Sequence, residues 1–192
     1  MWDVVCQGGI RVRDPVKLAL EIGFSQAAEF SAPELRALPE VREMCRSDRC
    51  RRYGRSWSCP PACGTIEETS ARMHSYQKGV LVQTTAKLED DFDVEHMAEA
   101  EKRHKANFMT LARQMRMIAP GCLPLSAGSC TICRNCSYPE KPCRFPGKML
   151  SSMEAYGLLV SEVCVLAGMK YYYGPKTLTY SSCVLWEERT EQ

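Results

Sequence analysis

Eight of the twelve cysteines fall into two short sets whose spacing suits a metal or a metal cluster. The first set has C-x4-C-x8-C-x3-C spacing and consists of Cys45, Cys50, Cys59 and Cys63. The second has C-x2-C-x2-C-x6-C spacing and consists of Cys130, Cys133, Cys136 and Cys143. Three cysteines at i, i+3 and i+6 wrap the backbone around a four-iron cluster, and a more distant cysteine closes the fourth corner. The second set therefore favours a [4Fe-4S] cluster.

Zinc is the main alternative for both sets. A single zinc ion prefers two close pairs of ligands, which the run of x2 spacings in the second set fits poorly. The first set has no C-x2-C pair, so its pattern is less specific by itself. Disulfides usually support small domains with little core, and a chain of 192 residues does not need them. We expect two [4Fe-4S] clusters, with zinc, or structural or disulfide-bonded cysteines, as the alternatives.

Arginines are interleaved with the first cysteine set, and Arg51, Arg52 and Arg55 are the candidate cofactor-contacting residues. A cluster with four thiolates carries net negative charge, and nearby guanidinium groups raise its reduction potential. Two other interpretations stay open for these arginines. They form a solvated charged face, or a docking patch for an acidic redox partner.

The remaining polar and cysteine residues give no second constellation. The cysteines outside the two sets lie in apolar or strand-like stretches, where cysteine behaves as a small buried hydrophobe: Cys6, Cys122, Cys164 and Cys183. The three histidines lack metal-ligand spacing and are expected to be packed or exposed. No segment matches a Walker A or dinucleotide-binding motif.

The elements that must position the two sets follow from periodicity and capping signals. Helices are expected at 15–24, 31–45, 66–78, 93–118 and 151–168, and strands or extended runs at 79–88, 122–128, 170–174 and 177–186. Thr65 and Glu68 form a capping-box pattern at the third helix. Strands separated by helices predict an α/β or α+β fold with one central sheet layered with helices. We expect one domain over 1–192, with cysteine-rich metal-binding loops at about 45–63 and 130–143.

Composition limits the classes of partner and compartment. The 25 basic and 23 acidic residues nearly balance, so the net charge of +2 gives no reason to expect nucleic acid as a partner. No stretch has the length and apolarity of a signal peptide or a membrane span. We therefore expect a cytoplasmic protein without membrane attachment.

Two segments carry a resemblance to a known family. They are "CRRYGRSWSCPPACG" (50–64) and "GSCTICRNCSYPEKPCRFPGKMLSSMEAYGLLV" (128–160). Together they resemble the cysteine-rich family of predicted metal-binding proteins called domain of unknown function 2284, a bacterial and archaeal group best known from anaerobes. The resemblance runs from about Met44 to the last strand and implies metal binding through the eight cysteines. It implies no particular reaction.

Three functions are compatible with these patterns. The first is an electron carrier or redox adaptor that reduces a partner enzyme, such as a corrinoid-dependent methyltransferase, because no other cofactor motif is present. The second is a cluster-dependent enzyme in which the candidate arginines hold a small anionic substrate near Ser152, Glu154 and Tyr156. The third is a structural zinc protein that binds a partner.

Overall fold

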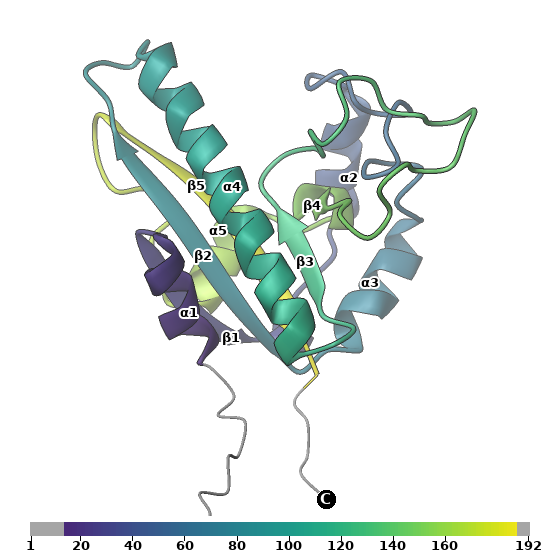
Figure 1. Ribbon diagram of the computed structural model, residues 1–192, viewed down its shortest axis with the longest axis horizontal. Coiled ribbons are helices and arrows are strands. Elements are labelled where there is room, and N and C mark those ends of the chain that lie inside the picture. Colours follow the sequence, from purple (N-terminus) through teal and green to yellow (C-terminus); the bar gives the residue numbers. More distant parts are fainter. Residues whose placement is uncertain (1–13, 188–192) are drawn as a thin grey trace, which may run out of the picture.

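The computed structural model describes residues 14–187, and a five-stranded sheet runs through its centre (Figure 1). The spatial order of the strands is β1-β2-β5-β3-β4. Neighbouring strands are antiparallel except for β3 and β4, which are parallel. The strands are β1 (Gln26–Ser31), β2 (Lys78–Lys87), β3 (Leu123–Ser126), β4 (Ser151–Ser152) and β5 (Thr177–Trp186). This mixed sheet with its helices confirms the predicted α/β class, while a single domain over the whole chain stays a prediction.

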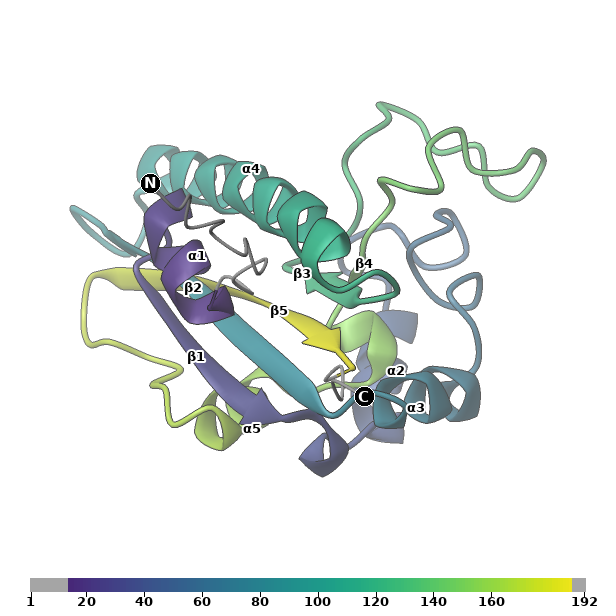
Figure 2. The same ribbon diagram turned by 60° about the horizontal axis from the view of Figure 1, so that its bottom comes forward.

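Helices cover both faces of the sheet, because the long strands β2 and β5 alternate apolar side chains between the two faces. Figure 2 shows α1 (Pro15–Ile22) and α4 (Val94–Ile118) over one face and α5 (Val160–Leu166) against the other. Val80, Val82 and Val184 pack with α1 and α4. Leu81, Cys183 and Leu185 pack on the opposite side with α5 and the helices α3 (Ile66–His74), η1 (Ala32–Glu34) and η2 (Glu154–Tyr156).

Local capping determines where the predicted helices begin. Asp14 caps α1 by accepting a hydrogen bond from the Val16 amide at 2.9 Å. Thr65 and Glu68 form the predicted capping box at α3, with both reciprocal bonds present. The helix α4 is amphipathic, and no helix among residues 14–187 has the length and apolarity needed to cross a bilayer.

Two predicted helices are interrupted, and this is a correction to the sequence prediction. The stretch 31–45 forms η1 and a separate α2 (Pro39–Arg46), because the residue before a proline avoids the helical region and Leu38 is extended at φ −99°, ψ 120°. The stretch 151–168 divides into β4, η2 and α5, since Gly157 has φ 79°. A Cβ atom at Gly157 would lie 3.2 Å from the Leu38 backbone nitrogen, so the residues that interrupt the two predicted helices lie against each other.

Buried polar groups on β2 and β5 surround one histidine of α4. His104 is fully buried, with Nδ1 2.9 Å from Thr84 Oγ1 and Nε2 2.7 Å from Ser182 Oγ. Burial, and secondarily the Lys105 ammonium, lowers the pKa of His104 to about 4. The expectation of a packed histidine is confirmed for this residue.

The predicted core cysteines are buried where the structure describes them. Cys122, Cys164 and Cys183 are 8%, 0% and 0% exposed. Burial raises the pKa of each thiol, as expected for a cysteine used as a small apolar group. Cys6 lies outside the described residues.

Candidate metal centres

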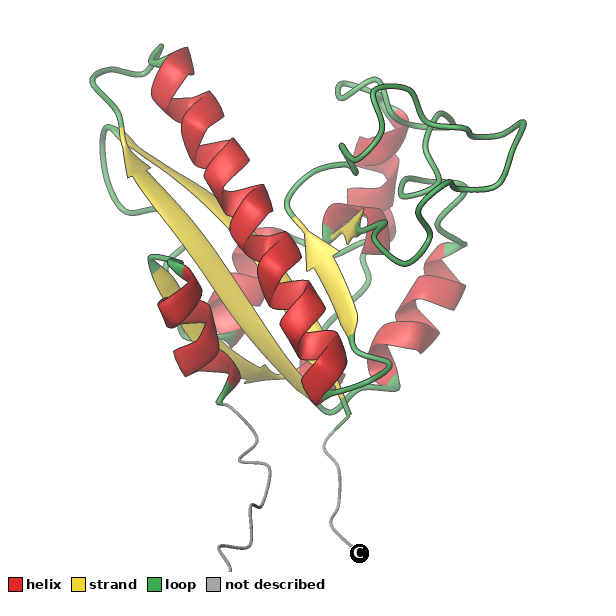
Figure 3. Cartoon of the chain, viewed as in Figure 1, coloured by secondary structure: helices red, strands yellow, loops and turns green. Residues whose placement is uncertain are grey.

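Two irregular loops lie together beside the β3–β4 edge of the sheet (Figure 3). The first loop, residues 47–65, joins α2 to α3, and the second loop, residues 127–150, joins β3 to β4. The second cysteine set lies entirely in the second loop. The first set begins at Cys45 in the last turn of α2 and continues through the first loop.

All four cysteines of the second set line one small cavity, together with side chains of the first loop. Trp57 and Ser58 come from the first loop, and Phe145 and Met149 close another side. Burial works to raise the pKa of Cys136, but the backbone amides of Tyr138, Trp57 and Ser137 and the Ser56 hydroxyl outweigh it and lower the pKa. This environment favours the thiolate, the form that binds metal.

Three cysteines of the first set share a larger cavity of about 430 Å³ with Glu154, called here the Glu154 cavity. Cys45, Cys50 and Cys59 line it, while the Cys63 sulfur faces the Ala155 carbonyl at 3.6 Å. Burial raises the pKa of Cys45 to about 11; the Glu154 carboxylate adds to the rise, and the Arg42 guanidinium opposes it. Because metals bind thiolates, occupation of this set would release protons.

Arg42 fastens both ends of the first cysteine set to the η2 helix. Its Nη1 donates to the Ala155 carbonyl at 2.6 Å, and its Nη2 donates to the Gly64 carbonyl at 2.7 Å. Gly64 directly follows Cys63, and Arg42 lies one helical turn before Cys45. A single planar guanidinium therefore fixes the positions where the first set begins and ends.

The two loops contact one another through Trp57 and Ser58. Trp57 Nε1 donates to the Lys141 carbonyl at 3.0 Å, and its ring meets that of Tyr138 edge to face with centroids 4.9 Å apart. The Ser58 hydroxyl accepts from the Cys130 amide at 3.2 Å and lies 3.7 Å from the Cys59 sulfur. Ser58 is fully buried and connects a cysteine of each set.

The candidate arginines occupy three different positions. Arg52 lines the cavity of the second cysteine set. Arg55 is exposed, with Nη2 3.9 Å from Asp48 Oδ2. Arg51 is also exposed, at a left-handed backbone position with φ 55°. Contact of these three residues with a cofactor stays a prediction.

The donor types fit a thiol-binding metal, but the side chains are not arranged around a single ion. Within residues 14–187, no group of three or more histidine, cysteine, aspartate or glutamate side chains is placed so that it could hold a metal ion. The cysteines in this range form no disulfide. What the structure provides is the gathering of the second set on one cavity and of three first-set cysteines on another.

The two cysteine-rich loops lie together at one edge of the sheet. This arrangement makes the protein a candidate metal-binding protein. The family model described as "Predicted metal-binding protein (DUF2284)" matches residues 28–186. The chain belongs to this family. Comparisons with curated proteins and with solved structures found no match.

Sequence analysis did not predict the roles of several residues that shape the two centres. The bonds of Arg42 and Ser58 join segments far apart in the chain, so no local spacing reveals them. The bond of Trp57 to the second loop joins distant segments in the same way. The only local signal for Arg42 was its position one turn before the first cysteine.

Proposed function

We propose that each cysteine set binds a [4Fe-4S] cluster and that the protein is an electron-transfer adaptor for a partner enzyme. The observation that carries the proposal is the Ser58 contact, which puts the hydroxyl 3.7 Å from the Cys59 sulfur and 3.2 Å from the Cys130 nitrogen. Two clusters held by these loops would therefore be neighbours. In a cubane each thiolate binds a different iron, so its ligands need not surround one ion.

The chain's own residues would tune such clusters in two ways. A bound cluster supplies one-electron chemistry, and hydrogen bonds to its thiolates raise its reduction potential. The amides and the Ser56 hydroxyl around Cys136 would act in this way at the second set, and the Ser58 hydroxyl at the first. Trp57 and Phe145 cover part of the second cavity and would limit the access of water.

For the partner we propose a cytoplasmic enzyme that needs low-potential electrons, with a corrinoid-dependent system as one candidate. The exposed arginines of the first loop support docking to an acidic surface, because complementary charge speeds association between redox partners. Neither a membrane nor nucleic acid is part of this proposal.

A reductive titration tests the electron-transfer role. Anaerobically purified protein should show a low-potential EPR signal that appears with dithionite and disappears on reoxidation. Ser58→Ala should lower the potential of the first cluster, because it removes a donor near the Cys59 sulfur, while Ser47→Ala, whose hydroxyl bonds the Met44 carbonyl at 2.7 Å, should not. The absence of a reversible signal, or a colourless preparation containing stoichiometric zinc, would refute the role.

A cluster-dependent enzyme is the second candidate, favoured by the cavity of about 430 Å³ that three first-set cysteines share. A metal centre with an adjoining cavity can bind a substrate at its edge. Turnover of a small molecule that requires Cys45, Cys50 and Cys59 would favour this candidate over a simple carrier.

A further inference from the structure

We propose that the Glu154 cavity binds a small organic amine, a protonated N–H donor carried on an apolar body. The cavity has a volume of about 430 Å³, which lies within the usual range for small-molecule sites. The inference concerns the ligand of this cavity and goes beyond electron transfer. It concerns the part of the cavity that a metal centre on Cys45, Cys50 and Cys59 would leave free.

Glu154 lines the cavity, and its carboxylate defines the ligand chemistry. Oε2 of Glu154 is buried and has no hydrogen-bond partner among the described residues. A buried carboxylate oxygen without a donor is unfavourable, and a charged N–H donor would satisfy it. An ammonium group also has the charge that complements the carboxylate, whereas an anion would be repelled.

The remaining walls suit the apolar part of such a molecule. Aliphatic and aromatic side chains come from α2, the first loop, the η2–α5 segment and the α5–β5 connection: Val41, Tyr53, Pro60, Leu158, Val160 and Tyr171. Arg49 is the cationic lining residue, and it is exposed to solvent. Arg51, Arg52 and Arg55 do not line this cavity, so Glu154 is not neutralised by them there.

Three probes with the same ring separate charge recognition from apolar binding. Ligand-observed NMR titrations would use benzylamine, benzyl alcohol and phenylacetate with the full-length, anaerobically purified, metal-loaded protein. A charged hydrogen bond to Glu154 should make benzylamine bind at least about tenfold more tightly than benzyl alcohol. Phenylacetate should bind more weakly than either. Equal binding of benzylamine and benzyl alcohol would overturn the proposal.

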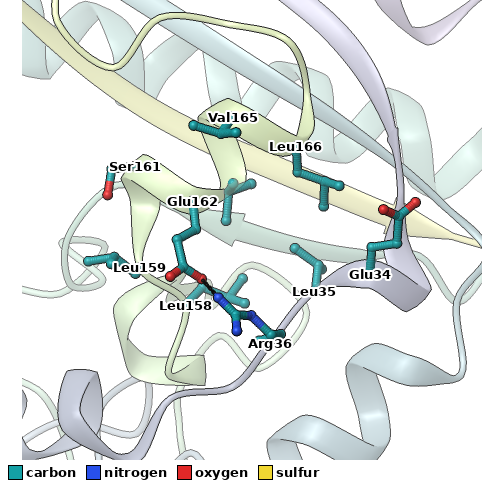
Figure 4. Close-up of a pocket in the computed structure, with 10 residues that line it drawn as sticks. Glu34, Leu35, Arg36, Leu158, Leu159, Ser161, Glu162, Val165 and Leu166 are labelled. Carbon is teal, nitrogen blue, oxygen red and sulfur yellow. Dashed lines mark hydrogen bonds and ion pairs between the residues drawn. The ribbon is translucent and has the colours of Figure 1, made fainter.

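Two carboxylate variants test whether Glu154 causes the preference for benzylamine over benzyl alcohol. Glu154→Gln should abolish the advantage of benzylamine, while Glu162→Gln should keep it. Glu162 belongs to the same segment but does not line the cavity. It points towards Arg36, with Oε2 3.0 Å from Arg36 Nη2 (Figure 4). A preference that survives Glu154→Gln would overturn the assignment of the site.

A cavity-filling variant keeps the test decisive should Glu154→Gln fold poorly. Val160→Trp should fill the cavity from its α5 side and reduce the binding of benzylamine and benzyl alcohol together. Unchanged binding by this variant would contradict the location. Metal and sulfide content measured on the same samples separates the two proposals. A preference for the amine without bound iron would refute only the cluster proposal. Bound iron and sulfide without a preference for the amine would refute only the amine site.

Discussion

Replacing Arg42 by methionine should destabilise the protein strongly, because this residue closes the first cysteine set. Its guanidinium donates to two backbone carbonyls, of Ala155 at 2.6 Å and of Gly64 at 2.7 Å. A hydrogen bond involving a charged group contributes about 1.5–3 kcal/mol. Arg42 is half-buried, so solvent partly replaces these bonds on substitution. We expect Arg42→Met to lower the free energy of unfolding by about 3 kcal/mol.

Arg36→Met is the matched control for this prediction. Arg36 and Glu162 form an ion pair at 3.0 Å, but their side chains are 68% and 42% exposed. An exposed ion pair contributes at most about 1 kcal/mol. Arg42→Lys tests geometry separately, because one ammonium cannot reproduce the planar fork that reaches both carbonyls, and it should recover only part of the lost stability.

Urea denaturation of the three variants and the unmodified protein gives the comparison. Bound metal contributes to stability, so every sample must have the same measured metal content. The reasoning predicts a much larger loss for Arg42→Met than for Arg36→Met. Similar losses for the two variants would refute the role of Arg42 in closing the first cysteine set.

Two further predictions test the core. Gly79→Ala should lower the free energy of unfolding by about 3 kcal/mol, because its Cβ would lie 2.3 Å from the Phe30 ring, whereas Gly147→Ala meets no atom within 4 Å and should change little. His104 has a pKa of about 4 when folded and about 6.5 when unfolded, so the unfolded chain binds more protons between these values. The contribution of neutral His104 to the free energy of unfolding is therefore complete above pH 6.5. Acidification from pH 7 to pH 5 should lower the free energy of unfolding by about 2 kcal/mol.

Chemical denaturation measures both effects. Equal stabilities of the Gly79 and Gly147 variants would contradict the packing argument. For the histidine, the slope of stability against pH between 7 and 5 should decrease in His104→Gln. An unchanged slope would show that other groups produce it.

The sequence predicted the elements whose signals are local. Asp14 with Pro15 marked the start of α1, and Thr65 with Glu68 marked the start of α3, because caps act within one helical turn. The apolar stripe of α4 predicted its full extent up to Ile118, since a continuous amphipathic helix needs no distant partner to define its period.

Features determined by distant contacts were missed. The strand β1 was not predicted, because its sequence QAAEFS has little β-propensity and forms a strand by pairing with β2. Gly157 was predicted to lie inside a helix, but it interrupts that helix. It packs against the Leu38 backbone, and its carbonyl accepts a hydrogen bond from the Leu38 amide at 2.8 Å. The run 170–174 was predicted to be extended, but it forms no strand.

The candidate site divides in the same way. Spacing identified both cysteine sets, and the structure gathers the second set on one cavity. Spacing could not show that Ser58 contacts Cys130, or that Glu154 shares a cavity with Cys45, because these contacts join separate segments of the chain. Cysteine spacing alone also leaves the metal open, which is why cluster identity remains a proposal.

The most direct test of the central claim is the iron and acid-labile sulfide content of the anaerobically purified chain. Two [4Fe-4S] clusters predict about eight irons and about eight sulfides per chain. Either Cys50→Ser or Cys133→Ser should reduce both numbers to about four, since each variant disrupts one cluster. Stoichiometric zinc without sulfide, or only about four irons in the unmodified chain, would contradict the account.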